Sequence, residues 1–232
     1  MNRFENCLYR DVCDYDTECK KACPRYSITK YMLENSNIPK SLWKVNKLEP
    51  EDCDIKAFET LSDIRENIVD FVKGGNSLYL YSETCGNGKT TWAIKLALQY
   101  INDVWEHTGY NVRVIFVNVP WFFNMCKSII SYPDEAFNEF KNNIYTVDLV
   151  IWDEVSAKYL SAYEYDMLYH ILEHRITNGK ANIYTGNSLI DKLSLIMDPK
   201  LVSRITKGAK IQLKGGDRRN GTTSNSFSNI NI

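Results

Sequence analysis

The sequence predicts an α/β protein in which helices cover both faces of a parallel sheet. Between residues 77 and 187, short apolar segments rich in β-branched residues alternate with longer segments whose apolar residues recur at helical spacing. The short segments are almost continuously apolar, which is typical of strands that are buried on both faces. Strands that alternate with helices in this way favour a parallel sheet, with the helices as crossover connections.

The expected elements follow one another with short connections. A first helix is predicted at 57–75, where apolar residues recur every three or four positions and two glycines supply the stop. Beyond it the pattern predicts four strands, at 77–82, 111–119, 146–154 and 181–187. Three helices are expected between them, at 88–109, 120–132 and 161–180.

The composition indicates a globular protein without a membrane partner. Of the 232 residues, 44% are hydrophobic, which is enough to bury a sizeable core. The apolar runs are far shorter than the roughly 20 residues that a membrane-spanning helix needs. No export signal is evident at the start of the chain, so a cytoplasmic location is expected. The net charge of −1 excludes a general attraction to nucleic acid and leaves that role to local basic segments.

The chain divides into three segments. Residues 1–40 are rich in cysteine and end in a polar, proline-containing stretch that is typical of a linker. Residues 41–219 carry the predicted sheet domain. Residues 220–232 are polar and lack periodicity, and we expect this tail to be disordered.

A glycine-rich loop separates the first predicted strand from the helix that follows it. Residues 81–91 read YSETCGNGKTT, which ends the phosphate-binding loop pattern correctly but has Glu83 where that pattern begins with glycine. In such a loop the backbone N–H groups face the phosphates, the lysine reaches the β- and γ-phosphates, and the last hydroxyl ligates Mg²⁺. We expect ATP and Mg²⁺ to be bound by Thr84, Cys85, Gly86, Asn87, Gly88, Lys89, Thr90 and Thr91.

Two acidic residues, Asp153 and Glu154, end the third predicted strand. Asp153 is placed to coordinate Mg²⁺, directly or through an intermediate group, and Glu154 to orient and polarise an attacking water. The alternative is that both acids simply begin a loop. Their distance of about 65 residues from the glycine loop, with a strand and a helix between, favours the catalytic interpretation.

Two further polar residues follow in the chain. Asn187 comes just after the fourth strand, where an amide can sense the γ-phosphate or the attacking water, although asparagine at a strand end is commonly a turn residue. Arg204 can stabilise charge on the ATP of a neighbouring subunit, or it can be an exposed arginine on a helix.

The order of these motifs resembles the AAA+ ATPases that load replicative helicases, the DnaC/DnaI-like group, with IstB-type transposition ATPases as near relatives. The resemblance covers roughly residues 40–219. It rests on Gly-x-Gly-Lys-Thr at 86–90, LVIWDE at 149–154, YTGN at 184–187, VSRI at 202–205 and KGGDRR at 214–219.

This resemblance implies an AAA+ P-loop ATPase core that binds and hydrolyses ATP between the subunits of a homo-oligomer. It also implies that the protein engages single-stranded DNA and delivers a hexameric replicative helicase to it during DNA replication. The resemblance matches Lys89 and Thr90 to the Walker A lysine and Mg²⁺ ligand, and Asp153 and Glu154 to the Walker B pair. It matches Asn187 to sensor 1 and Arg204 to the arginine finger. The small size also favours a phage or prophage origin.

Two positions depart from the family pattern. Glu83 removes a glycine that would allow positive φ and introduces a carboxylate near the phosphates unless it points away, so slower turnover is plausible. Gly186 replaces a serine that is usual in the relatives, a change expected to affect the sensor loop only slightly.

Four of the seven cysteines lie within the first 23 residues. Cys7, Cys13, Cys19 and Cys23 can supply a tetrahedral Zn²⁺ site that folds an otherwise core-poor segment. An iron–sulfur cluster or four unrelated thiols remain as alternatives. Helicase loaders that resemble this chain often carry a small N-terminal domain that binds the helicase, and a zinc-binding domain here can serve that role.

Candidate contacts for single-stranded DNA are few. Trp121, Phe122 and Phe123 can stack on bases, but packing in the core is the preferred interpretation of these aromatic residues. A basic segment near the end of the chain contains Lys200, Arg204, Lys207, Lys210, Lys214, Arg218 and Arg219.

Two rival functions stay open. The chain can be a transposition or regulatory ATPase of the IstB type, which needs target DNA but no helicase. It can also be a helicase-binding adaptor with weak ATPase activity, in which case Glu83 is the sign of a decayed site.

Overall fold

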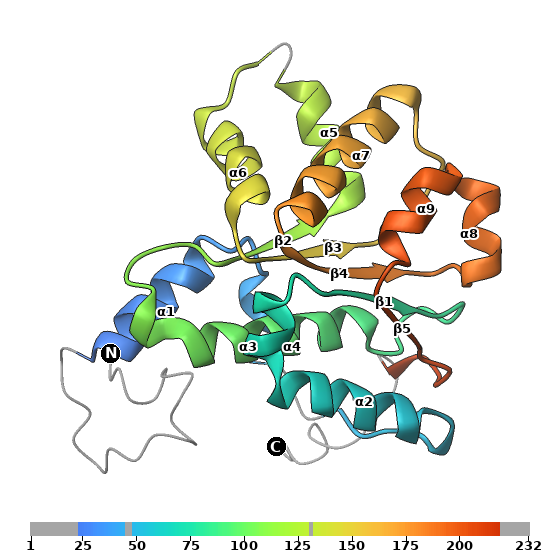
Figure 1. Cartoon of the computed structure of the whole chain (residues 1–232), viewed down its shortest axis with the longest axis horizontal. Helices are drawn as coiled ribbons and strands as arrows, with labels where there is room; N and C mark the ends of the chain where they lie inside the picture. The colour runs from blue at the N-terminus through green and yellow to red at the C-terminus, as the bar shows by residue number, and fades with distance from the viewer. Residues whose placement is uncertain (1–22, 45–47, 130–131, 219–232) are drawn as a thin grey trace, which may run out of the picture.

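The computed structural model describes residues 23–44, 48–129 and 132–218. These residues form a five-stranded sheet with helices on both faces (Figure 1), which confirms the predicted α/β fold. All neighbouring strands are parallel, in the spatial order β2-β3-β4-β1-β5. The strands are β1 (Ser77–Tyr81), β2 (Val114–Asn118), β3 (Leu149–Asp153), β4 (Ala181–Gly186) and β5 (Ala209–Gln212).

The helices form a layer on each side of the sheet (Figure 1). One layer contains α1 (Pro24–Glu34), α2 (Ile55–Glu66), α3 (Ile68–Lys73) and α4 (Lys89–Val104). The other contains α5 (Val119–Ser128), α6 (Glu135–Thr146), α7 (Ala162–Thr177), α8 (Ile190–Ile196) and α9 (Pro199–Ile205). Single 3₁₀ turns lie at Lys40–Leu42, Asp52–Asp54 and Trp105–His107. Among the residues described, no helix is long and apolar enough to cross a membrane.

The two helical layers bury opposite faces of the same strands. In β1, Leu78 and Leu80 pack with the layer of α4, whereas Tyr79 between them packs with the layer of α5 and α7. In β3, Ile151 and Trp152 divide in the same way. Successive residues of a strand point to opposite faces, so burial of both faces explains why the strands are continuously apolar in the sequence.

Several elements differ from the sequence-based expectation. The helix predicted at 57–75 is two helices, α2 and α3, separated at Asn67 (φ −109°, ψ 27°). Helix α6 was not predicted, although the Asp134 side chain caps its first turn and Phe137 and Ile144 are buried. Strand β5 was also missed, because its four residues are partly exposed and contain no apolar run.

Helix α1 belongs to the packed core. Met32 and Leu33 on α1 and Ile38 just after it are buried in the same cluster as α2 and α4. The Asn37 side chain also donates to the Phe116 carbonyl of β2, at 3.0 Å. The packed sheet domain therefore includes residues before position 41, and the expected boundary at residue 40 falls inside this packed region.

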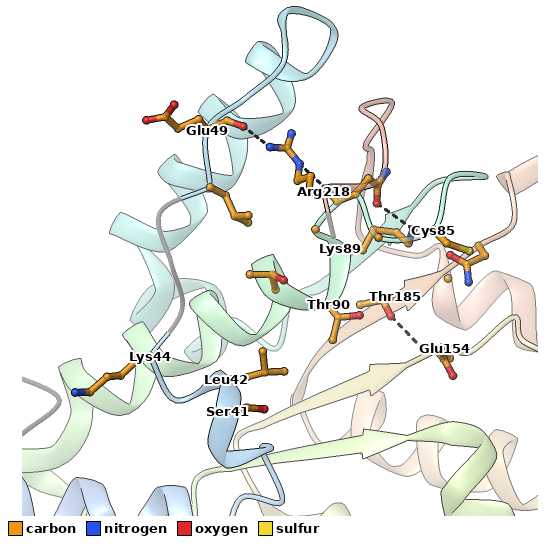
Figure 2. Close-up of a pocket in the computed structure, with 17 residues that line it drawn as sticks. Ser41, Leu42, Lys44, Glu49, Cys85, Lys89, Thr90, Glu154, Thr185 and Arg218 are labelled. Carbon is orange, nitrogen blue, oxygen red and sulfur yellow. Dashed lines mark hydrogen bonds between the residues drawn. The ribbon is translucent and has the colours of Figure 1, made fainter. Parts of the chain in front are cut away.

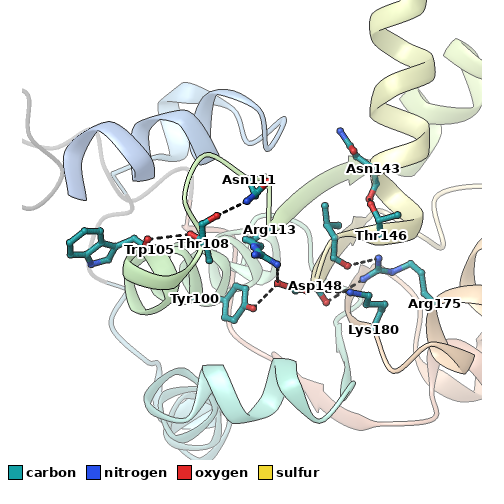
Figure 3. A network of polar contacts seen from close by, with 11 residues as sticks. Tyr100, Trp105, Thr108, Asn111, Arg113, Asn143, Thr146, Asp148, Arg175 and Lys180 are labelled. Carbon is teal, nitrogen blue, oxygen red and sulfur yellow. Dashed lines mark hydrogen bonds and ion pairs between the residues drawn. The ribbon is translucent and has the colours of Figure 1, made fainter. Parts of the chain in front are cut away.

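A buried arginine ties together the amino ends of β3 and β4 (Figure 3). Arg175 on α7 is fully buried and donates to the carbonyls of Ile144, Val147 and Ala181 at 2.6–3.0 Å, and to the Asn182 side chain at 2.8 Å. Beside it, the Asp148 carboxylate accepts from Tyr100, Arg113 and Lys180 at 3.1–3.3 Å. This network fixes the end of the sheet opposite the glycine loop.

Candidate nucleotide-binding site

The glycine loop lies at the carboxyl end of β1, where it leads into α4. Gly86 (φ 74°) and Gly88 (φ 104°) adopt the left-handed conformation that glycine tolerates best. The Lys89 ammonium is held inside the loop, where it donates to the Thr84 carbonyl at 2.8 Å and to the Asn87 side chain at 3.1 Å. The Asn87 amide in turn donates to Ser82 Oγ at 2.7 Å, so the loop is a closed, internally bonded turn.

One carboxylate oxygen connects two neighbouring strands and a helix at this edge. Asp153, at the end of β3, uses Oδ1 to accept from the hydroxyl of Thr90 on α4 and from that of Thr185 on β4, both at 2.7 Å. Thr90 and Asp153 were predicted to act together at Mg²⁺, and they are in direct contact. Thr185 was not predicted, although its place at the end of a buried strand beside β3 is the signal that could have identified it.

The predicted catalytic acid, Glu154, has an unusual backbone. Its φ of +61° is rare for a residue with a side chain and is often found at functional sites. Its N–H donates to Thr185 Oγ1 at 3.1 Å, and its exposed carboxylate accepts from Asn118 Nδ2 at 3.2 Å. Asn118 ends β2 and also caps α5, where its side chain accepts from the Trp121 N–H. Sequence analysis missed Asn118, because a polar residue before a helix indicates a cap and nothing more.

Asn187 is positioned by a residue two places after Glu154. The Asn187 N–H donates to Ser156 Oγ at 3.0 Å, and Tyr79 OH donates to the carbonyl of Ser188 at 3.0 Å. A Cβ atom on Gly186 would lie 2.6 Å from both Ser156 Oγ and Tyr79 OH. These two hydroxyls occupy the space next to Gly186, so a side chain at this position would require them to move.

Glu83 points away from the lysine of the loop. Its carboxylate accepts a hydrogen bond from Lys192 on α8, and this hydrogen bond and the charge of Glu83 raise the pKa of Lys192. Position 83 does not need glycine either, because Asn37 and Glu154 are the non-glycine residues with positive φ in the described part of the chain. Both concerns raised by Glu83, a strained turn and a carboxylate facing the phosphates, are thus answered by the geometry.

These residues surround a pocket of about 500 Å³ (Figure 2). It is lined by Glu154 and Asn187 and by every predicted loop residue except Thr84. The carbonyl of Thr84 accepts the hydrogen bond from Lys89 Nζ. Residues that were not predicted also line it, namely Ser41, Leu42, Lys44, Leu48, Glu49, Thr185, Gly186 and Arg218. Arg204 is elsewhere: it contacts Glu173 at 2.8 Å and Tyr169 at 3.2 Å on α7.

Oxygen atoms at the edge of the pocket suit a magnesium ion, although Asp153 itself is buried and is not among the residues that line the pocket. A hydroxyl and a carboxylate, those of Thr90 and Asp153, lie in contact next to the lysine of the loop, and oxygen is the donor that Mg²⁺ prefers. No group of three His, Cys, Asp or Glu side chains forms a metal site among the residues described. Of the predicted zinc ligands, Cys7, Cys13 and Cys19 lie outside the described residues, whereas Cys23 caps α1 with its sulfur.

Other predicted residues are explained by packing. Phe122 and Phe123 are fully buried, and Trp121 is half-exposed with its ring edge against Phe137 and Phe140. Core packing was the preferred interpretation of these three residues, and for the two phenylalanines the burial confirms it.

Comparison with known proteins identifies the family. Residues 57–212 match the family model of the bacterial DnaA ATPase domain. The chain belongs to this family. It is therefore an AAA+ ATPase that binds a nucleotide, and the matched region includes the glycine loop, Asp153, Glu154 and Asn187. A search of curated proteins found no match.

Solved structures share the fold of this DnaA-family ATPase at low sequence identity. The DnaC helicase loader matches with a TM-score of 0.63 and 19% identity, over 76% of this chain and 100% of that one. DnaI matches with a TM-score of 0.59 and 22% identity, over 76% of this chain and 94% of that one. DnaA from Aquifex aeolicus, solved with AMPPCP bound, gives 0.55 and 22% over 72% of this chain. This chain spans 48% of that DnaA structure, about half its length.

Proposed function

We propose that this AAA+ ATPase is an ATP-dependent loader that binds a hexameric replicative helicase and delivers it onto single-stranded DNA. The observation that carries the proposal is the extent of the similarity. The match spans the whole DnaC helicase loader chain but only about half of the DnaA chain. The correspondence over the full DnaC chain, together with the nucleotide pocket, supports the loader proposal.

In this proposal the glycine loop binds the phosphates of ATP. Backbone N–H groups of the loop and Lys89 neutralise the β- and γ-phosphates, and Thr90 and Asp153 hold Mg²⁺, which supplies further charge neutralisation. Glu154 orients a water molecule and accepts its proton as the water attacks the γ-phosphorus, the bond between this phosphorus and the β–γ bridging oxygen breaks, and ADP leaves. The hydrogen bond from Asn118 fixes the direction of that carboxylate, and Asn187, held by Ser156, lies where it can contact the γ-phosphate or the water.

Hydrolysis in this scheme takes place between subunits. Arg204 does not line the pocket of its own subunit, and in this proposal it acts on the ATP of a neighbour in a homo-oligomer. Single-stranded DNA binds to the basic segment that follows α8, where the exposed lysines are Lys200, Lys207, Lys210 and Lys214.

The helicase contact is assigned to the N-terminal segment. Cys7, Cys13, Cys19 and Cys23 bind one Zn²⁺ in this proposal, because four thiolates are a sufficient tetrahedral set. Metal analysis of the purified protein should find about one zinc per chain, and Cys7→Ser together with Cys13→Ser should remove it. A protein that is metal-free, or that carries iron, would contradict the zinc assignment without affecting the ATPase site.

The loading function is tested by mixing the protein with the replicative helicase of the same genome. Light scattering, with and without ATP, should show a joint complex of defined mass. With the Lys89→Ala variant, formation of this complex should no longer depend on ATP. If no complex forms in any nucleotide state, the loader proposal fails and an IstB-type ATPase that acts on DNA becomes the better explanation. A complex without hydrolysis, even with single-stranded DNA present, would indicate an adaptor.

A further inference from the structure

We infer that Arg218 is a positioning residue for the glycine loop. Residues Leu213–Arg218, which we call the brace, follow β5 and run along the outer side of this loop. The brace overlaps the KGGDRR motif and the basic segment considered for DNA contact, but neither assignment gives it a role in nucleotide binding. The inference rests on the proposed role of the loop in binding ATP phosphates, and it adds a residue on which that role depends.

The brace and the loop are joined by three hydrogen bonds. The Arg218 N–H donates to the Gly86 carbonyl at 3.1 Å, and Arg218 Nε donates to the Asn87 carbonyl at 3.2 Å. In the opposite direction, the Asn87 side-chain amide donates to the Leu213 carbonyl at 3.1 Å. The fit is close at Gly86, where an added Cβ atom would lie 1.9 Å from the Asp217 carboxylate.

These contacts determine where the loop directs its N–H groups. In a planar trans peptide, the carbonyl oxygen and the following N–H point in opposite directions, and all described peptide bonds are trans. When Arg218 holds the carbonyls of Gly86 and Asn87, it also fixes the N–H groups of Asn87 and Gly88 on the other side. Backbone N–H groups of such loops are the donors that cradle phosphate.

The brace is itself anchored to the core. Asp54, which is fully buried, accepts from the N–H groups of Lys214 and Gly215 at 2.7 and 2.9 Å. The Arg218 guanidinium donates to the Glu49 carbonyl (Figure 2) and lies 5.4 Å from the ring centre of Phe58 on α2. Glu51 adds a carboxylate 3.8 Å from Arg218 Nη2. Arg218 therefore connects the loop to α2 and does not swing freely in the pocket.

The test measures the affinity of the full-length protein for ATP, ADP and AMP by calorimetry. The loop acts on the β- and γ-phosphates, so Arg218→Ala should weaken ATP and ADP binding by about tenfold, the scale of one lost charge-assisted hydrogen bond. AMP binding should change little. Arg218→Lys keeps the charge but not the spacing of the donors and should restore part of the affinity. Lys73→Ala is the control for the loss of a positive charge, because this side chain is exposed on α3 and does not line the pocket.

Each result has one meaning. Equal losses for ATP and AMP in Arg218→Ala, or no loss at all, would overturn the positioning role, since a damaged fold does not discriminate between phosphates. If Arg218→Ala does not fold, the same three affinities measured for Arg218→Lys decide the question. A wild-type protein that binds none of the three nucleotides would instead refute the proposed nucleotide site.

Discussion

Glu154 shows how the local backbone places a side chain for chemistry. Its left-handed φ of +61° turns the carboxylate out of the strand direction, and its N–H is satisfied by Thr185 in the adjacent strand. Asp153, one residue earlier, stays buried and points at Thr90. Two consecutive acids therefore face different partners, which is what separate roles in holding an ion and activating water require.

Substitution of the two central residues of the site should separate binding from hydrolysis. Glu154→Gln should reduce the ATP turnover rate by about 100-fold or more while ATP still binds, because the proton acceptor is lost but the loop is intact. Lys89→Ala should abolish measurable ATP binding. Fluorescence titration with an ATP analogue measures binding, and a phosphate-release assay measures the turnover rate.

Lys95→Ala, on the same helix as Lys89, is the control for the loss of a positive charge. Turnover at the wild-type rate in Glu154→Gln, or unchanged binding in Lys89→Ala, would mean that the site is assigned to the wrong residues.

Glu83 should be dispensable for nucleotide binding. Its side chain is exposed and is engaged with Lys192, and exposed ion pairs contribute about 0–1 kcal/mol to stability. Glu83→Ala should therefore leave the affinity for ATP within about twofold of wild type by the same titration. A loss of tenfold or more would show that the contact between the glycine loop and α8 is required for binding.

The sequence predicted the site residues that belong to a known motif. It did not predict the residues that hold them in position. Lys89, Thr90, Asp153 and Glu154 follow from spacing along the chain, and the structure brings them together. Asn118, Ser156, Thr185 and Arg218 act through contacts across the sheet or between distant segments. The sequence around Asn118 and Ser156 does not indicate such partners, whereas Thr185 could have been identified from its place at the end of a buried strand.

Among the elements, helix α7 begins with a buried charge. The Glu164 carboxylate is 2% exposed and accepts from Lys127 of α5 and Lys158 of the preceding loop, both at 2.8 Å, while Ser161 completes a capping box. Burial alone would raise the pKa of Glu164, but the hydrogen bonds from the two lysines and Ser161 outweigh it and lower the pKa from 4.5 to about 2. The helix start is thereby linked to α5.

The stability that Glu164 contributes should depend on pH in a defined direction. Its folded-state pKa lies below its unfolded value, so the contribution is complete above about pH 5 and is lost as the pH falls through 2. Glu164→Gln should lower the free energy of unfolding by about 1–3 kcal/mol at pH 7 and by much less near pH 2.

Urea unfolding across this pH range measures the difference, with Glu139→Gln on the exposed surface of α6 as the control. The same difference at both ends of the range would refute the linkage.

Among the residues of the polar network at the amino end of the sheet, Arg175 should contribute most to the stability of the protein. Arg175→Met fills a similar volume but leaves buried carbonyls without donors, so the free energy of unfolding should fall by about 3 kcal/mol or more. Arg113→Met, a partly exposed partner of Asp148 in the same network, should cost under about 1 kcal/mol. Equal effects of the two changes in denaturant unfolding would contradict this ranking.

The elements predicted from the sequence were those with a long, strong pattern. The four continuously apolar strands and α7 are where they were expected, because strands that are buried on both faces leave an apolar run in the sequence. Helix α6 and strand β5 are stabilised mainly by what they pack against. A segment such as 209–212, of which one residue is buried, gains its strand conformation from pairing with β1.

At the scale of the whole molecule, the position of Arg204 predicts that two inactive variants restore each other. Arg204→Ala and Glu154→Gln should each have low ATPase activity. In an equal mixture of the two, about a quarter of the interfaces pair an intact Glu154 with an intact Arg204 from the neighbour, and activity should return in proportion. Because the Arg204–Glu173 pair is partly exposed, Arg204→Ala should change the melting temperature little. An inactive mixture would exclude an arginine finger that acts between subunits.

The two hydroxyls that meet at Asp153 Oδ1 have a consequence for conformational entropy. A threonine hydroxyl in water rotates among several orientations, but the hydrogen bond at 2.7 Å aims the Thr90 O–H at the carboxylate and leaves its lone pairs turned away from it. The rotational freedom of this hydroxyl is therefore lost when the protein folds, and not when an ion arrives. Because the second bond, from Thr185, holds the same oxygen in place, a cation that approaches Thr90 meets a ligand that is already ordered.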